Sequence, residues 1–324
     1  MGKRDDAILL MNQLGTQRVP FLFVVDFDMK QPVVRPLAEV NECDILYDIH
    51  SFTNCSIRAR PDRPFVFKKH PVPFIEYQRA YRTVLEHLNR GNSYLLNLTF
   101  PTRIETDLTL DDIFHLSSAK YRLLVKDSFV VFSPEIFVQI HGGIISSFPM
   151  KGTIDAHLED AEAIILGDAK ELAEHTTIVD LIRNDLSIIA KHVRLEQFRY
   201  IDHIHTNQKD LLQVSSKISG ELPADYHKHI GTILFDLLPA GSVTGAPKRK
   251  TVDIIKSVEP YNRGYYTGVF GYFDGSSLDS GVMIRFIEQT PGGPVYKSGG
   301  GITVSSSAEK EYEEMVDKVY VPIV

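Results

Sequence analysis

The sequence predicts a large single α+β domain in which antiparallel sheets pack face to face and are covered by helices. Between residues 121 and 148, short apolar segments follow one another through tight turns, which is typical of an antiparallel meander and not of a βαβ repeat. Apolar residues recur at helical spacing in four longer segments, at 74–88, 169–190, 247–258 and 308–319. A chain of 324 residues, 43% of them hydrophobic, can bury the large core that this fold requires.

The first half of the chain is predicted to be mostly strands. The apolar run Pro20–Asp26 predicts a strand, and the mixed segment 32–64 predicts a loop that contains Pro61 and Pro64. A helix at Phe74–Leu88 leads through a turn into a strand in the stretch GNSYLLNLTF. Thr109 is placed to cap a short helix at Leu110–Leu116. The meander strands are predicted at Tyr121–Val125, Phe129–Phe132, Ile136–Ile140 and Ile144–Phe148, with a turn at Gly142 and Gly143.

The second half alternates between helices and strands. After Pro149 the pattern becomes helical through Ala190. Pro247 suits the first turn of a helix that extends to Val258, and the last helix is predicted at Ala308–Val319. Further strands are predicted at His192–Leu195, Leu211–Ile218, Tyr265–Phe273 and Gly281–Glu288.

Composition excludes several classes of protein. The formal net charge of −7 gives no basic field for nucleic acid, so an anionic substrate would need local positive charge or a metal ion. Cys43 and Cys55 have neither metal-ligand spacing nor a disulfide pattern, which favours a reducing compartment. The N-terminus lacks a long apolar stretch, and no run approaches the length of a membrane span. We therefore expect a soluble, cytoplasmic protein without nucleic-acid or membrane partners.

Two helices carry pairs of carboxylates at the same spacing. Glu171 and Glu174 are three residues apart and share one face near the start of the helix 169–190, at the edge of its apolar stripe. Glu311 and Glu314 repeat this spacing in the last helix. Such pairs could together hold one Mg²⁺, which prefers oxygen ligands. The alternative is that acids in a first turn complement the helix dipole or form a solvated face.

Two glycine-containing loops are candidate anion sites. Gly299, Gly300 and Gly301 precede Ile302 between a predicted strand and the last helix, where backbone N–H groups could approach an anion, although a plain turn explains them equally well. The stretch LLPAGSVTGAPKRK leads into a helix that starts near Ala246, with Thr244 as its cap, and helix N-termini bind carboxylates and phosphates.

Three single residues are candidates for catalysis or binding. Lys151, predicted in a loop, would normally be a solvated charge, but a buried lysine can lose its proton and act as a nucleophile. Glu135 ends a strand and could serve as a general acid if it is desolvated. Arg285 lies in an apolar predicted strand and therefore needs an anionic partner, for which a ligand carboxylate is a candidate.

Together these motifs resemble the chorismate-utilising enzymes, which include anthranilate synthase component I, aminodeoxychorismate synthase component I, and isochorismate and salicylate synthases. The matching stretches run in the family's order from about residue 76 to the C-terminus: GNSYLLNLT, SPEIF, PMKGT, EHTTIVDLIRNDL, LLPAGSVTGAPK, YYTGVFGYFD, VMIRF and SGGGITVSSSAEKEYEEMVDK. The resemblance implies an anthranilate synthase component I-like fold, with a chorismate-binding catalytic region at 76–324. Residues 1–75 would form a shortened N-terminal region integrated into the same domain.

The resemblance also implies roles for individual residues. The magnesium-site acids would be Glu171, Glu174, Glu311 and Glu314, and the metal would neutralise the ring carboxylate of chorismate. The enolpyruvyl carboxylate would be held by Arg285 and Tyr266, assisted by Lys318 and the backbone of Gly299, Gly300 and Gly301. Thr153 and Thr244 would line the substrate site, and Glu135 would act on the leaving C4 hydroxyl.

Lys151 indicates the subgroup. Aminodeoxychorismate synthases resemble this chain in having lysine in the P-x-x-G-T motif, where other members typically have alanine. The lysine would attack C2 and expel the C4 hydroxyl, and ammonia would then enter at C4 and displace the lysine. Gln213 departs from the family pattern, which usually has histidine there; glutamine cannot shuttle protons at neutral pH, so that role is assigned elsewhere.

Neither cysteine lies in the glycine-flanked turn expected of a glutaminase nucleophile. The resemblance therefore implies a separate glutamine amidotransferase subunit that supplies ammonia. No tryptophan feedback motif is recognisable, so feedback control is not expected. The hypothesis is an aminodeoxychorismate synthase component I; the alternatives are anthranilate synthase component I, isochorismate or salicylate synthase, and a non-catalytic binding subunit with the same fold.

Overall fold

The computed structural model describes residues 2–56, 65–204 and 210–323. Pro61 and Pro64 of the predicted loop lie outside these residues, whereas the described part of the segment 32–64 contains strands at Val33–Pro36, Ile45–Ile49 and Phe52–Thr53 that were not predicted. The helices are α1 (Lys3–Thr16), α2 (Phe74–Asn89), α3 (Leu110–Leu116), α4 (Ala161–Gly167), α5 (Ala169–Ile189), α6 (Ile230–Leu237), α7 (Lys248–Val258) and α8 (Ala308–Asp317), with 3₁₀ turns at Leu37–Glu39, Tyr226–His229 and Gly241–Val243. None of the described helices is long and apolar enough to cross a membrane.

The first sheet, which we call sheet A, has nine strands among the described residues. Its order is β11-β13-β10-β9-β16-β15-β1-β2, and β12 pairs with β13. All of its pairings are antiparallel. The strands are β1 (Phe21–Val25), β2 (Val33–Pro36), β9 (Ile136–His141), β10 (Ile144–Ser147), β11 (Met150–Asp155), β12 (Lys191–Ile204), β13 (Leu211–Glu221), β15 (Val269–Phe273) and β16 (Leu278–Val282).

The second sheet, sheet B, also has nine described strands, all antiparallel. Its order is β14-β6-β18-β17-β8-β7-β3-β4, and β5 pairs with β6. The strands are β3 (Ile45–Ile49), β4 (Phe52–Thr53), β5 (Phe67–His70), β6 (Leu95–Thr106), β7 (Tyr121–Val125), β8 (Phe129–Ser133), β14 (Gly245–Ala246), β17 (Phe286–Thr290) and β18 (Gly293–Ile302).

Strand β1 shows why the sheets stack. Its five residues are all buried, because alternate side chains enter different cores. Leu22 and Val24 join a cluster with Tyr121 and Phe286 of sheet B, so the two sheets share a core. The other face of β1 packs in a cluster with residues of α1, α5 and α6. The predicted fold class is therefore confirmed: two antiparallel sheets pack on each other and are covered by helices.

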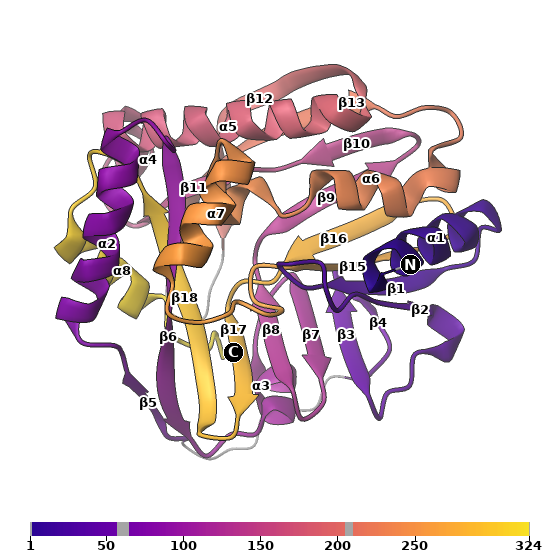
Figure 1. Cartoon of the computed structure of the whole chain (residues 1–324), viewed down its shortest axis with the longest axis horizontal. Coiled ribbons are helices and arrows are strands. Elements are labelled where there is room, and N and C mark those ends of the chain that lie inside the picture. Colours follow the sequence, from indigo (N-terminus) through magenta and orange to yellow (C-terminus); the bar gives the residue numbers. More distant parts are fainter. Residues whose placement is uncertain (1, 57–64, 205–209, 324) are drawn as a thin grey trace.

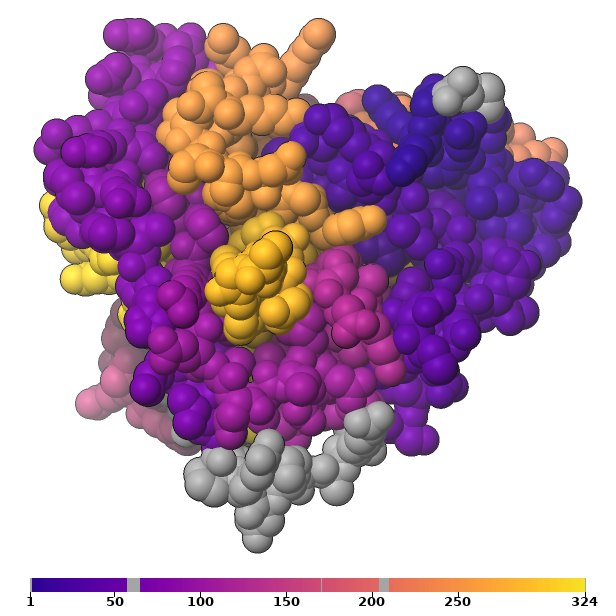
Figure 2. All heavy atoms as spheres, turned by 60° about the horizontal axis from the view of Figure 1, so that its bottom comes forward, coloured from indigo at the N-terminus to yellow at the C-terminus, as the bar shows by residue number. Residues whose placement is uncertain are grey.

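The helices cover the outer faces of the two sheets. In Figure 1, α5 and α6 run along the top of the molecule over sheet A, while α2 and α8 lie on the left beside β6 and β18. Figure 2 shows indigo and purple segments of the N-terminal third on both sides of orange and yellow segments from the last third. The two ends of the chain therefore contribute to one continuous body.

Local signals explain the helices that the sequence predicted. The Asp168 side chain accepts the backbone N–H of Glu171 at 2.9 Å and starts α5, which ends one residue before the predicted Ala190. Thr109 and Asp112 form the capping box of α3 as expected. Helix α1 was not predicted, although its buried residues Ala7, Met11 and Leu14 have helical spacing.

Candidate active site

One cleft of about 1150 Å³ is lined by every residue that the sequence singled out as a candidate. These are Glu135, Lys151, Thr153, Glu171, Glu174, Gln213, Thr244, Tyr266, Arg285, Gly299, Gly300, Gly301, Glu311, Glu314 and Lys318. They come from both sheets, from α5 and from the α8 region, so they converge only because the sheets and their helical cover meet here.

Glu135 and Arg285 lie where the chain crosses between the sheets. Glu135 connects β8 of sheet B to β9 of sheet A, and Arg285 connects β16 of sheet A to β17 of sheet B. The predicted single strand Gly281–Glu288 was therefore wrong: it is two strands in different sheets. Arg285 has a left-handed φ of 52°, a backbone conformation that a side chain of this size adopts at some cost. Its carbonyl accepts the N–H of Phe132 at 3.1 Å, which ties the two crossovers together.

Arg285 is a cation of the cleft that lies among tyrosines. Within the part of the chain that the structure describes, no carboxylate forms an ion pair with it. The tyrosines Tyr266, Tyr296 and Tyr320 act on its pKa, which is raised even though burial opposes the charge. A buried guanidinium without an acidic partner is suited to a ligand carboxylate.

Glu135 is a cleft carboxyl group whose pKa is raised. The Ser242 hydroxyl donates a hydrogen bond to Glu135 Oε1. Burial raises the pKa of Glu135 above its ordinary value, against the lowering effect of that hydrogen bond and of Arg285. A carboxyl group with a raised pKa can donate its proton to a leaving group near neutral pH.

Lys151 lies on strand β11 and not in a loop before helices, which corrects the prediction for this segment. The residues after Pro149 form β11 because they pair with β13, where Lys151 is opposite Val214. Lys151 Nζ donates to Glu174 Oε2 of α5 at 2.6 Å. Burial lowers the pKa of Lys151, but the charge and hydrogen bond of Glu174 together with the charges of Glu171 and Glu314 outweigh it, so the pKa is raised. In this arrangement Lys151 is an ammonium ion.

Helix α8 places a second group of charges opposite. Lys318 Nζ lies 2.6 Å from Glu314 Oε1 and donates to the Gly299 carbonyl at 3.0 Å. Burial lowers the pKa of Lys318, although Glu314 opposes this. The three glycines belong to strand β18, so the predicted turn between a strand and a helix was wrong there. A Cβ on Gly301 would lie 3.6 Å from Lys151 Nζ, so Gly301 adjoins the end of this lysine.

The remaining candidates form the walls of the cleft. Thr153 is opposite Gln213 across β11 and β13, and Gln213 is buried. Burial raises the pKa of Tyr266 well above its ordinary value, so this phenol stays neutral. The Thr244 hydroxyl donates to the Ala240 carbonyl at 2.9 Å and does not cap a helix, because α7 begins later, after Pro247.

Four glutamates of the cleft, Glu171, Glu174, Glu311 and Glu314, are the candidate magnesium ligands. Within 2–56, 65–204 and 210–323, no group of three or more metal-ligating side chains is already gathered around one point. However, a Cβ on Gly300 would lie 3.4 Å from Glu311 Oε2 and 3.9 Å from Glu314 Oε1, so the glycine leaves free space beside both acids. Mg²⁺ usually takes only one or two carboxylates and keeps water or substrate oxygens, and this donor set fits that use.

His175 is a buried titratable residue that the sequence did not single out, and it does not line the cleft. It is buried next to Glu174 on α5, and its Nε2 lies 2.7 Å from the Ser216 hydroxyl of β13. Burial, and secondarily the charges of Arg199 and Lys151, lowers the pKa of His175 from 6.5 to about 4.

Folding should become less favourable in mild acid because of His175. The pKa of His175 is lowered in the folded state, so the unfolded chain binds more protons between pH 6.5 and about 4. The free energy of unfolding therefore decreases as the pH decreases through this window. We expect the free energy of unfolding to drop by about 2 kcal/mol from pH 7 to pH 5 through this residue alone. Urea unfolding of the wild type and of His175→Gln at both pH values measures it; equal pH dependence in the two proteins would contradict the prediction.

The fold and the cleft define an α+β protein of two stacked antiparallel sheets with a large, highly charged cleft. Two crossovers between stacked antiparallel sheets present an arginine and a carboxyl group with a raised pKa to a cleft whose lining also contains four lysines and five further glutamates. A family model described as chorismate binding enzyme matches residues 38–323, so the chain belongs to this family.

Individual relatives agree with this membership. A Haemophilus influenzae protein with the name uncharacterized PabA-like protein is 51% identical over 96% of this chain and 95% of its own. Aminodeoxychorismate synthase component 1 of Escherichia coli K12 is 30% identical over 75% of this chain, which spans 56% of that relative's length. The structure of MenF, the menaquinone-specific isochorismate synthase of E. coli, shares the fold, with a TM-score of 0.75 at 15% identity over 98% of this chain and 81% of that one.

Proposed function

We propose that the protein is an aminodeoxychorismate synthase component I, which converts chorismate and ammonia to 4-amino-4-deoxychorismate on the route to 4-aminobenzoate and folate. The observation that carries the proposal is Lys151, whose Nζ projects into the cleft beside Glu174 and Gly301. An amine at this place is a nucleophile once it loses its proton. The similarity to aminodeoxychorismate synthase component 1 of E. coli supports the same reaction.

In the proposed reaction, Lys151 Nζ attacks C2 of the chorismate ring. The ring double bonds shift, the C4–O bond breaks, and the hydroxyl leaves as water after it takes a proton from Glu135. Ammonia then forms a bond to C4, the electrons shift back, and the C2–N bond to Lys151 breaks. The pyruvyl ether stays intact, so the net change replaces hydroxyl by amine. Burial of Glu135, which keeps its proton available, suits the first of these steps.

The charges of the cleft suit a dicarboxylate substrate. Arg285, with Tyr266 and Lys318 beside it, would bind the enolpyruvyl carboxylate, and Thr153 and Thr244 would line the ring site. Magnesium, when bound by Glu171, Glu174, Glu311 and Glu314 directly or through water, would neutralise the ring carboxylate. The described cysteines are free, and neither is a cleft residue, so a glutamine amidotransferase subunit would supply the ammonia.

One assay separates this reaction from the others in the family. We expect the purified chain, with chorismate, Mg²⁺ and ammonium at alkaline pH, to form 4-amino-4-deoxychorismate, identified by mass spectrometry. Removal of Mg²⁺ by a chelator should abolish the product, and addition of Mg²⁺ should restore it.

Other products would point to other enzymes. Anthranilate as the main product would assign the chain to anthranilate synthase component I, and isochorismate or salicylate to those synthases. No turnover, even with an amidotransferase subunit present, would favour a non-catalytic binding subunit, for which Gln213 in place of the family's histidine is the feature to test first.

A further inference from the structure

The C-terminal segment after α8 forms a wall of the cleft, and it has no part in the proposed reaction. Val319 and Ile323 are buried in a cluster with residues of α3, whereas Tyr320 between them is 46% exposed and lines the cleft together with Pro322. Residues that pack in this cluster alternate with residues that line the cleft. Because Val319 and Ile323 hold the backbone, the Tyr320 ring stays on the cleft side.

This segment is pinned by its backbone. The Tyr320 carbonyl accepts the hydroxyl of the buried Tyr296 at 3.1 Å, and the Pro322 carbonyl accepts the N–H of Ser118 at 2.7 Å. Ser117 and Ile323 form an antiparallel bridge. None of these contacts uses the Tyr320 ring, so the ring can be changed without loss of the anchors.

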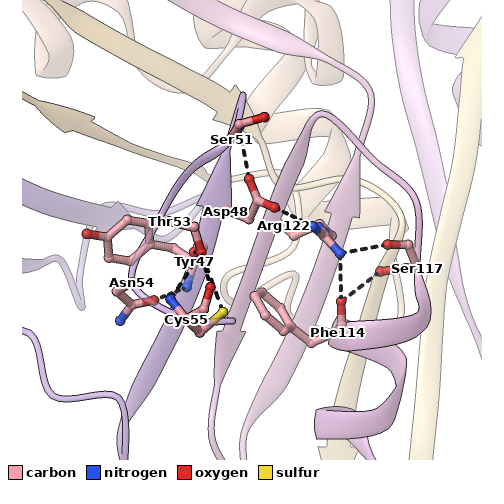
Figure 3. Close-up of polar contacts among 9 residues, drawn as sticks. All are labelled: Tyr47, Asp48, Ser51, Thr53, Asn54, Cys55, Phe114, Ser117 and Arg122. Atoms are coloured by element: carbon pink, nitrogen blue, oxygen red, sulfur yellow. Dashed lines mark hydrogen bonds and ion pairs between the residues drawn. The ribbon is translucent and has the colours of Figure 1, made fainter. Parts of the chain in front are cut away.

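The C-terminal segment binds to the turn after α3, which contains Ser117 and Ser118. This turn is itself held by hydrogen bonds, as Figure 3 shows. The guanidinium of Arg122 donates to the carbonyls of Phe114 at 3.3 Å and Ser117 at 3.0 Å, and it pairs with Asp48. Arg122 also lies 5.6 Å from the Phe114 ring. A charge that satisfies the last carbonyls of a helix fixes the turn that follows it. The wall therefore has a rigid support.

The Tyr320 ring lies over the guanidinium of Arg285, with 5.3 Å between the Arg285 Cζ and the ring centroid. An aromatic ring over a guanidinium contacts its face, whereas the N–H donors lie in its plane and remain available for a carboxylate. The contact also restricts the rotation of a long side chain, which lowers the entropy lost when a ligand binds.

We propose that Tyr320 is a positioning residue that holds Arg285 ready for a substrate carboxylate and thereby favours carboxylate-bearing ligands in this cleft. The proposal rests on the proposed function only in taking chorismate as the ligand. It does not depend on the Lys151 chemistry or on the identity of the product.

The chain lacks tryptophan, which gives a direct probe. Tyr320→Trp keeps a flat aromatic ring over Arg285 and introduces the only tryptophan of the chain into the cleft wall, where it can be excited apart from the tyrosines. We expect its emission to change as chorismate is added with Mg²⁺ and without ammonium. Tyr94→Trp is the matched control, because Tyr94 is 66% exposed and does not line the cleft, so its emission should not change.

Two further variants measure the role of the ring. By calorimetry, Tyr320→Leu should bind chorismate about five- to tenfold more weakly, the loss expected for one partly desolvated contact between a cation and a ring. Tyr320→Phe should bind within about twofold of the wild type, because the ring face remains. In active protein the change should appear in KM with kcat nearly unchanged, as expected for lost binding that is uniform along the reaction.

Several results would overturn the proposal. One is wild-type affinity for chorismate in Tyr320→Leu. A second is equal weakening of binding in Tyr320→Phe and Tyr320→Leu, which would assign the effect to the hydroxyl. A third is no emission change in Tyr320→Trp at saturating chorismate. Circular dichroism melting checks that the variants are folded. Binding as expected together with a product other than 4-amino-4-deoxychorismate would overturn the proposed function and leave the role of Tyr320 intact.

Discussion

Replacement of Lys151 by alanine should lower the rate of 4-amino-4-deoxychorismate formation by at least about 100-fold, the lower range for loss of a group that acts on the reacting atoms. The reason is geometric, because Lys151 lines the cleft and its Nζ lies beside Glu174 and Gly301. Without this amine the proposed attack at C2 has no nucleophile. The measurement is the initial rate with chorismate, Mg²⁺ and saturating ammonium.

Lys151→Arg is the matched control for charge. An arginine can keep an ion pair with Glu174, but its guanidinium does not lose its proton and cannot attack the ring. We expect Lys151→Arg to bind chorismate and to be as inactive as Lys151→Ala. Wild-type rates in Lys151→Ala would contradict the proposed nucleophile, and wild-type rates in Lys151→Arg would assign the residue a purely electrostatic role.

The ion pair with Glu174 makes the proposed reaction depend on pH. Its charge raises the pKa of Lys151, so the amine form is scarce at neutral pH and increases as the pH rises. The rate should therefore rise toward alkaline pH. A ligand that draws Glu174 away from Lys151 would remove the main contribution that raises this pKa. Glu174 thus keeps Lys151 protonated while the two are paired. When Glu174 binds another group instead, Lys151 would lose its proton more easily and become a better nucleophile.

Local patterns were enough to predict some parts of the fold. Helix α5 could be predicted because its apolar spacing and acidic start lie within one continuous stretch. The split of Gly281–Glu288 into β16 and β17 could not, because a continuous apolar run gives no sign of where the chain leaves one sheet for the other. The left-handed φ of Arg285 marks this point only in three dimensions.

The candidate site was predictable as a set of residues but not as an arrangement. The motif resemblance selected residues that line one cleft. The contact between Lys151 and Glu174 joins a strand to a helix, and no spacing within the sequence could indicate it. Tyr320 was not singled out because it follows the last recognisable motif, and its partner Arg285 is distant in sequence.

A second large effect is expected at a buried ion pair behind the cleft. Glu259 and Arg263 are almost fully buried, and Arg263 donates to Glu259 Oε1 at 2.6 Å and to Glu259 Oε2 at 2.8 Å. Arg263 also donates to the carbonyls of Val243 at 2.8 Å and Asn97 at 2.7 Å, which are cleft residues. The pair therefore ties the loop that contains Thr244 to strand β6.

Glu259→Ala should lower the free energy of unfolding by about 3–5 kcal/mol, because it leaves the Arg263 charge buried without its counter-charge. It also removes the acceptor of the Thr99 backbone N–H, at 2.9 Å, and of the Thr99 hydroxyl, at 2.8 Å. Urea unfolding at pH 7 measures the effect.

Glu259→Gln should cost less than Glu259→Ala, because the amide oxygen still accepts hydrogen bonds while the charge is lost. Asp180→Ala is the matched surface control: it removes an exposed carboxylate 3.2 Å from Arg183 on α5 and should change stability by about 0.5 kcal/mol or less. A loss below about 1 kcal/mol in Glu259→Ala would mean that water or a neighbouring group compensates Arg263. In that case the loop with Thr244 would owe its position to packing and not to this ion pair, and chorismate binding should survive the substitution.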